Sequence, residues 1–260
     1  MKMTFEDIKG DIGWLQSNLS TRDTKYRRNF NRYCNNGRRS EDVWNPYGQP
    51  LSFYFAMTEE DTGIIPVINI IKSAVDTHIS KLSQTKVRPY FNTVNGSFRA
   101  RKVVRNAQMF FDEMYNSQDV YKKGIEAARD AEVFEVGHLW VNDETKAVER
   151  IRPWEFFYDR AEFQNNKLTR CFLWFRNYPL HYLEDKIKGT MYADRLRTLQ
   201  DTCSYFIYFD LKNKRKYEIV NETLIKESKL TFDICPVATL FYNPPIKGGY
   251  STSLADDIYS

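Results

Sequence analysis

Basic and aromatic side chains alternate between residues 22 and 39, and this pattern suits contact with a polyanion. The segment holds a single acid, Asp23, and its cations are Arg22, Lys25, Arg27, Arg28, Arg32, Arg38 and Arg39. Tyr26, Phe30 and Tyr33 lie between these cations. Arginine and lysine neutralise phosphates, while aromatic rings offer faces on which nucleobases stack. The segment is therefore the best candidate in this sequence for contacts with a polyanion, while a solvated face or an interface between subunits is the simpler interpretation and the one we favour.

A second group of cations falls in the first turns of a helix that Ser97 can cap. Its members are Arg99, Arg101, Lys102 and Arg105. The N-terminal turn of a helix carries the positive end of the macrodipole, so cations are disfavoured there. This cost predicts compensation by acids, which a neighbouring subunit could supply.

Catalytic motifs are missing from the sequence. The glycines form neither a phosphate-binding loop nor a dinucleotide-binding fingerprint, and no zinc-protease or serine-hydrolase motif occurs. His78, His138 and His181 are isolated, and His78 and His138 are expected to be structural. Carboxylates such as Asp256 and Asp257 could act as acid and base only if the fold brought a suitable pair together. We therefore predict a protein that is not an enzyme and needs no cofactor.

Cysteine spacing and composition limit the remaining classes. Cys34, Cys171, Cys203 and Cys235 are too far apart in sequence for a zinc or redox motif, which predicts reduced thiols. The chain has 260 residues, of which 42% are hydrophobic, enough for one large domain or two modest ones. Its net charge of +4 is mild for a dedicated nucleic-acid domain. No run approaches the ~18 apolar residues of a membrane span, so no membrane partner is expected.

Hydrophobic periodicity predicts helices in the first half of the chain. A helix over residues 66–86 has Ile68, Ile71, Val75, Ile79 and Leu82 on one face, begins near Pro66 and ends before Pro89. An earlier helix starts at Thr4. A helix from Ser97 to about Tyr115 has an apolar stripe formed by Ala100, Val103, Val104, Ala107, Phe110, Phe111 and Met114. Ser117 is expected to cap the next helix, in which Ala128 and Ala131 would let another backbone approach closely.

From Gly137 onward the period becomes that of strands. Residues 138–142 and 147–151 are expected to form a hairpin, followed by strands at 154–158, 168–175, 204–210, 216–220, 223–226 and 237–242. Helical pieces are predicted after Pro179 and over residues 192–199. This order predicts an α+β fold whose antiparallel β region could close into a barrel. The predicted subregions are 1–63, 64–136, 137–243 and a hinge with a short helix at 244–260. Because so short a helix is marginal alone, we expect a fragment, a split gene product or a processed form, or a helix that a neighbour completes.

Several short motifs, taken in order, resemble one family, the portal proteins of tailed bacteriophages. The helix with Asn69-Ile-Ile, Val75-Asp and Lys81-Leu runs into an Arg88-Pro exit, as in that family. Similar motifs are the Tyr33, Gly37 and Trp44 entry, the step from Ala131 through Gly137 to Asn142, the segments 151–161 and 172–180, and the segment 249–254. The resemblance covers most of residues 30–260, and it implies the N-terminal wing portion of a portal subunit.

A portal identity would imply a structural role in the virion. Such proteins form a ring, usually a dodecamer, at one capsid vertex, where the ring is the conduit for genome packaging and ejection. The implied partners are the major capsid protein, the terminase motor, tail adaptor or connector proteins and double-stranded viral DNA, with assembly in the host cytoplasm. The two basic clusters would then face DNA or neighbouring subunits. The alternative is a nucleic-acid-binding accessory protein that uses residues 22–39.

Overall fold

The computed structural model describes residues 4–34, 69–86, 88–93, 96–164, 168–187, 202–230, 232, 234–244 and 251–259. Two compact units are present, and each combines segments that are distant in sequence. Unit 1 consists of Met1–Asn69 and Pro153–Cys235, and unit 2 consists of Ile70–Arg152 and Pro236–Ser260. The four consecutive subregions inferred from the sequence stay a prediction.

Unit 1 is built on a five-stranded antiparallel sheet. Its strands follow the order β3 (Phe156–Tyr158), β4 (Arg170–Pro179), β5 (Thr202–Asp210), β6 (Arg215–Val220) and β7 (Thr223–Lys229). The β6–β7 hairpin turns through Asn221 and Glu222, whose φ angles are 42° and 66°. Two positive φ angles are typical of the tight turn that matches the twist of paired strands. The strands predicted after residue 200 in this unit are therefore confirmed.

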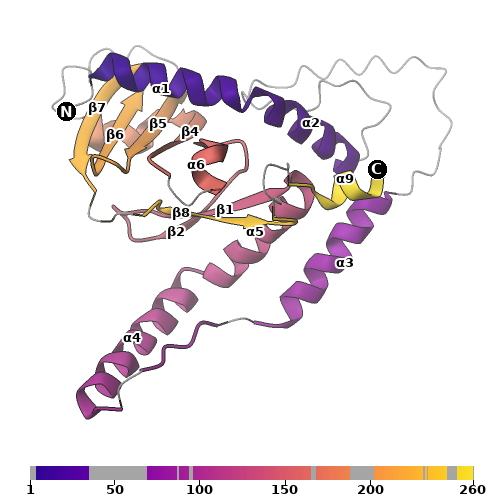
Figure 1. The fold of residues 1–260 in the computed structure, drawn as a ribbon, viewed down its shortest axis with the longest axis vertical. Helices are drawn as coiled ribbons and strands as arrows, with labels where there is room; N and C mark the ends of the chain where they lie inside the picture. The colour runs from indigo at the N-terminus through magenta and orange to yellow at the C-terminus, as the bar shows by residue number, and fades with distance from the viewer. Residues whose placement is uncertain are drawn as a thin grey trace. The chain divides into compact units, whose positions relative to one another are not determined.

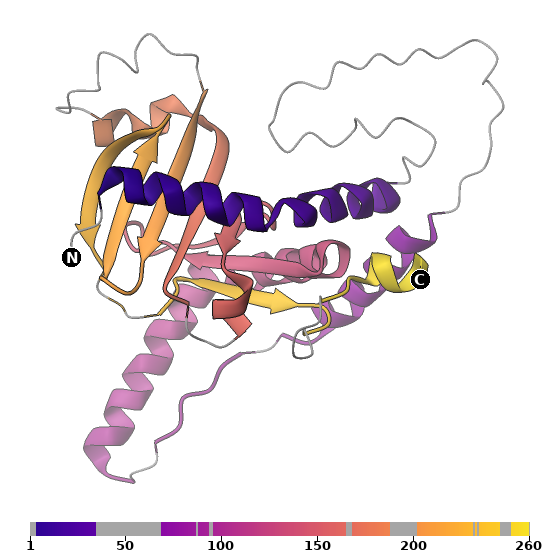
Figure 2. The ribbon, with the colours of Figure 1, turned by 45° about the horizontal axis from the view of Figure 1, so that its top comes forward.

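Two helices, α1 (Phe5–Asn18) and α2 (Ser20–Cys34), complete the main body of unit 1. Thr4 caps α1 as predicted, because its hydroxyl accepts from the Asp7 N–H while the Asp7 carboxylate accepts from the Thr4 N–H. Ile8, Leu15 and Leu19 form one buried stripe that packs on rings of the sheet, including Phe172 and Tyr208. Figure 2 shows α1 lying across this sheet. The core of unit 1 lies between helix and sheet.

Short helices occur at the ends of β4. α6 (Arg160–Gln164) precedes this strand and was not predicted, whereas the 3-10 helix η3 (Leu180–Leu183) and α7 (Glu184–Ile187) confirm the helix expected after Pro179. The strand is longer than predicted because its pairing with β5 shifts between Phe175 and Tyr178 and then resumes. The helical piece expected at 192–199 lies outside the described residues.

Unit 2 combines helices with a three-stranded antiparallel sheet. Its helices are α3 (Ile70–Gln84), α4 (Phe98–Ser117), α5 (Val120–Phe134) and α9 (Leu254–Tyr259). Its sheet has the order β2 (Val148–Ile151), β1 (Val136–Val141) and β8 (Val237–Phe241). The predicted β1–β2 hairpin is confirmed, and its turn is fixed by the Asn142 side chain, which accepts from the Glu144 N–H at 3.0 Å. α5 packs against these strands (Figure 1).

Three predictions about elements need correction. The described strands form two open antiparallel sheets and, among the described residues, neither closes into a barrel. Ser117 is the last residue of α4 and does not cap α5, because Asp119 adopts a left-handed φ of 50° at that position and turns the chain between the helices. Leu82 is half exposed, although Ile71, Val75 and Ile79 on the same predicted face are buried. Pro66 and Ile68 lie outside the described residues. The coarser prediction of an α+β fold is confirmed.

Candidate functional site

The first basic segment begins with an arginine that faces the interior of unit 1. Arg22 is 3% exposed, and its Nη1 donates to the Phe156 carbonyl oxygen at 2.7 Å. Its guanidinium lies 4.6 Å from the Phe157 ring centroid and also contacts the Asp23 carboxylate at 3.2 Å. Tyr26, one helical turn later, is buried as well. These two side chains therefore anchor α2 to the sheet and present little surface to a polyanion.

The other cations of this segment are at least partly exposed on α2 or lie beyond the described residues. Arg27 and Arg28 are exposed, and Lys25 and Arg32 are partly exposed. Arg38 and Arg39 lie outside the described residues. The alternation seen in the sequence thus becomes a two-sided helix, because residues four apart share a face and Arg22 and Tyr26 share the inner one.

The second basic cluster is open to solvent at the start of α4. Ser97 caps this helix as predicted, with its hydroxyl accepting from the Ala100 N–H at 3.3 Å. The cluster consists of Arg99, Arg101, Lys102 and Arg105, and all are exposed. Among the described residues, no carboxylate forms an ion pair with any of them. Four cations therefore stand uncompensated at the positive end of a helix dipole.

α4 also exposes apolar side chains. None of its residues is buried, and Phe98, Val103, Met109 and Phe110 are between 62% and 85% exposed. The opposite side of the helix is covered by residues 88–93, where the Phe91 and Phe111 rings meet edge to face at 5.6 Å. Figures 1 and 2 show α4 extending from the rest of unit 2 with only this segment beside it. Of the apolar stripe predicted for this helix, Val103, Ala107 and Phe110 are exposed and the other members are only partly buried.

A cavity of about 430 Å³ lies between α3, α5 and the end of β8 in unit 2. Leu82, Ala131 and Leu240 give it apolar walls, while His78 and Lys81 of α3 bring cationic side chains to it. Glu132 of α5 is its acidic member. All of these residues belong to unit 2, so the cavity is formed within one compact body.

Glu132 is the chemically unusual group of this cavity. Its side chain is 6% exposed, and its Oε2 is buried without a hydrogen-bond partner among the described residues. Its Oε1 lies 3.9 Å from His78 Nδ1, which is too long for a hydrogen bond. Burial raises the pKa of this carboxyl from 4.5 to about 7, although the nearby Arg129 acts in the opposite direction. The cavity thus contains an acid that lacks a donor.

Sequence reasoning treated His78 as structural and did not single out Glu132. No sequence signal singled it out, since Glu132 is one of four charged residues from Arg129 to Glu135. His138, also expected to be structural, is buried in β1 with its Nδ1 3.0 Å from Thr239 Oγ1. His181 is exposed in η3.

Replacing Glu132 by glutamine is expected to stabilise the protein above neutral pH. The raised pKa means that the folded state keeps a proton that the unfolded state has released between about pH 4.5 and 7, so the free energy of unfolding falls as pH rises through that window. At pH 8 the ionised carboxylate is buried without a donor, and E132Q should gain about 1–2 kcal/mol, with little change at pH 4. The other titratable groups that face this carboxyl are His78, Lys81, Arg129 and Tyr242, and the substitution leaves them unchanged.

Urea unfolding at several pH values measures this effect. Glu126→Gln is the matched control, because Glu126 lies on the same helix but is partly exposed and pairs with Arg150 at 3.6 Å. An E132Q protein whose unfolding free energy followed the wild-type pH profile would contradict the expectation.

Two cysteines that are distant in sequence meet in unit 1. Cys171 Sγ and Cys235 Sγ are 3.8 Å apart, although 64 positions separate them in the chain. Burial raises the pKa of the Cys171 thiol, and its hydrogen bond with Cys235 raises it further. The structure describes all four cysteines and joins none of them in a disulfide. The spacing of the cysteines in the sequence did not indicate this pair, because Cys171 lies in β4 and Cys235 lies in the segment before β8, and only the fold brings them together.

Metal sites, the aspartate pair and membrane spans were further possibilities raised by the sequence. Within the part of the chain that the structure describes, no group of His, Cys, Asp and Glu side chains has the arrangement of a metal site. Asp256 and Asp257 do not form an acid–base pair, since Asp256 bonds Ser253 and Asp257 bonds Asn243. No described helix has the length and apolar character to cross a membrane. No protein-family model matches the sequence, and no curated protein matches it either.

Proposed function

We propose that this protein is a structural subunit of a bacteriophage portal ring and that the described units belong to its wing portion. The observation that carries the proposal is the exposure of large apolar side chains along α4. A projecting helix with Phe98, Val103, Met109 and Phe110 exposed is costly for a monomer and favours association with another protein surface. In a ring, a neighbouring subunit would cover these side chains.

The order of elements also supports a portal subunit. The segments that resemble the family include a helix followed by a hairpin, and α5 runs into β1 and β2 at Gly137. They also include an aromatic strand after Pro153, where β3 lies, and a strand leading into a helix after Phe172, where β4 leads into η3. This agreement concerns local structure and the order of its elements.

The role we propose is mechanical and uses no catalytic group or cofactor. The ring, a dodecamer by analogy with the family, would occupy one capsid vertex of the virion and form the conduit for packaging and ejecting double-stranded viral DNA. It would contact the major capsid protein, the terminase motor and the tail adaptor or connector proteins. The exposed cations of α2 and α4 would face DNA or a neighbouring subunit.

Mass photometry and negative-stain electron microscopy test the assembly. The purified protein is expected to self-associate as its concentration rises and to form ring-shaped particles. The double substitution V103S/F110S should weaken association about tenfold or more, because it removes exposed apolar groups that become buried on assembly. Glu113→Gln, at an exposed polar position of α4, serves as control. A protein that stays monomeric at every concentration would argue against the proposal.

A nucleic-acid-binding accessory protein is the second candidate. The exposed Arg27 and Arg28 on α2 and the basic end of α4 favour it. Binding to DNA or RNA that weakens steeply with salt, by a protein that does not self-associate, would support this function over a ring subunit.

A further inference from the structure

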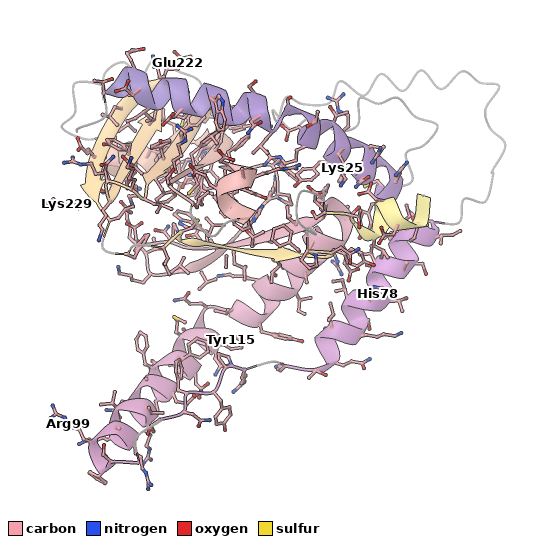
Figure 3. The ribbon with its side chains drawn as sticks, viewed as in Figure 1. Lys25, His78, Arg99, Tyr115, Glu222 and Lys229 are labelled. Carbon is pink, nitrogen blue, oxygen red and sulfur yellow. The ribbon has the colours of Figure 1, made fainter. Side chains whose placement is uncertain are left out.

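Unit 2 carries two unsatisfied charged features of opposite sign. One is the buried Glu132 carboxylate, whose Oε2 lacks a donor among the described residues. The other is the group of exposed cations at the start of α4, which have no acidic partner among those residues. Figure 3 shows Arg99 at the outer end of α4, away from α3 and His78. The two features therefore do not meet within one copy of the chain.

We propose that the Glu132 cavity binds an arginine or lysine side chain from the α4 basic end of a second copy of this chain. The contact rests on the proposed function, because it joins neighbouring subunits of the assembly. The cluster that would supply the side chain is Arg99, Arg101, Lys102 and Arg105.

The cavity has the composition that such a side chain requires. Leu82, Ala131 and Leu240 can pack against its methylene stem, and the charged head can then reach the carboxylate. A guanidinium offers paired donors to carboxylate oxygens, so it would satisfy the orphaned Oε2. A volume of about 430 Å³ leaves room for one long side chain. The contact would favour both groups. The Glu132 carboxylate would acquire a donor, and its negative charge would offset the unfavourable position of the cation at the positive end of the α4 dipole.

Several charged side chains near Glu132 affect whether an arginine or lysine from a second copy can enter the cavity. His78 and Lys81 are exposed at α3, and Arg129 lies on α5 and pairs with Asp76 at 3.7 Å. Lys81 can turn toward solvent as a cation enters, because its own head group has no carboxylate partner among the described residues. Tyr242 also lines the cavity, where burial raises the pKa of its hydroxyl, and it lies close enough to Glu132 for the carboxylate to raise this pKa further. The local balance therefore still permits a cation.

The proposed contact joins different surfaces of the two copies. The Glu132 cavity of one copy would bind the basic N-terminal end of α4 from the next copy. An interface between two different surfaces of this kind is head-to-tail. Such interfaces close into rings when the rotation between copies allows it, whereas identical patches give two-fold dimers. The contact is thus of the type that a ring subunit needs.

A double-mutant cycle on self-association tests the contact in the intact chain. The variants are Glu132→Gln, the quadruple substitution R99Q/R101Q/K102Q/R105Q, and the two combined, with Glu126→Gln as control. Sedimentation velocity gives the association constant of each protein. We expect E132Q and the quadruple variant each to weaken association by at least about tenfold, and the combined variant to lose no more than the stronger of the two. Circular dichroism checks the fold, and Glu132→Met replaces E132Q if the glutamine variant is misfolded.

The possible results distinguish failure of the proposed contact from failure of the proposed ring function. If the wild type assembles and both sets of substitutions leave association unchanged, the contact is wrong and the ring proposal stands. If the losses simply add, the two features act at separate places and the contact is again wrong. A wild type that never self-associates overturns both proposals.

Discussion

Replacing Gly137 by alanine is expected to unfold unit 2 or to destabilise it by more than about 4 kcal/mol. A Cβ at this position would lie 1.8 Å from the Ala127 carbonyl oxygen and 2.6 Å from its carbonyl carbon. Both atoms belong to the backbone of α5, so no side-chain rotation can relieve the clash. β1 approaches α5 this closely because Glu135, with a φ of 76°, reverses the chain directly after the helix.

Gly124→Ala is the matched control for this substitution. Gly124 lies in the first half of α5, where an added Cβ meets nothing within 4 Å. Because alanine is the better helix former, G124A should stabilise the unit by about 0.5–1 kcal/mol. Hydrogen exchange of the α5 and β1 amides measures both effects. Equal protection of these amides in G137A and in the wild type would show that the strand does not pack on α5 as described.

Replacing Arg22 by alanine is expected to destabilise unit 1 by about 3–4 kcal/mol. The change removes a buried side chain that fills space between Tyr26 and Phe157. It also deprives the Phe156 carbonyl of its guanidinium donor and leaves Asp23 with Arg176 at 3.8 Å as its cationic neighbour. Arg22→Lys should restore only part of the loss, since an ammonium lacks the planar fork that serves several acceptors at once.

The control for Arg22 is Arg27→Ala on the exposed face of α2. This change should leave the free energy of unfolding within about 0.5 kcal/mol of the wild type. Urea unfolding followed by circular dichroism gives both values. If R22A were as stable as R27A, the guanidinium would contribute nothing to the packing of α2. A salt-dependent loss of DNA binding in R27A but not in R22A would instead assign α2's outer face to nucleic acid.

Much of the local structure could be read from the sequence because its causes are local. Thr4 and Ser97 cap helices because a hydroxyl satisfies N–H groups within the next turn, whatever lies elsewhere. The same holds for the hairpin turn at Asn142, whose side chain bonds the backbone two residues on. The predicted cap at Ser117 is wrong because α4 continues through this residue. The left-handed backbone of Asp119 then separates α4 from α5.

The candidate sites depended on contacts that no local pattern contains. The stripe of α4 has the same periodicity as that of α3, yet Ile71 and Val75 are buried while Val103 and Phe110 are exposed. Periodicity fixes which residues share a face, but the partner of that face comes from elsewhere in the chain or from another molecule. A sequence pattern therefore cannot distinguish a helix that is buried in the core from a helix whose apolar side chains remain exposed for binding to another protein.

By itself, the sequence determined most of the described elements, their order and the α+β class, since helix caps, tight turns and apolar periods act over a few residues. Only the tertiary structure decided that Arg22 is an internal anchor, that Glu132 is a buried acid in a cavity, and that Cys171 meets Cys235. Charge and burial have energetic consequences only in relation to neighbours. Packing brings these neighbours together from distant parts of the chain, as it does for Arg22 and Phe156, which are 134 positions apart.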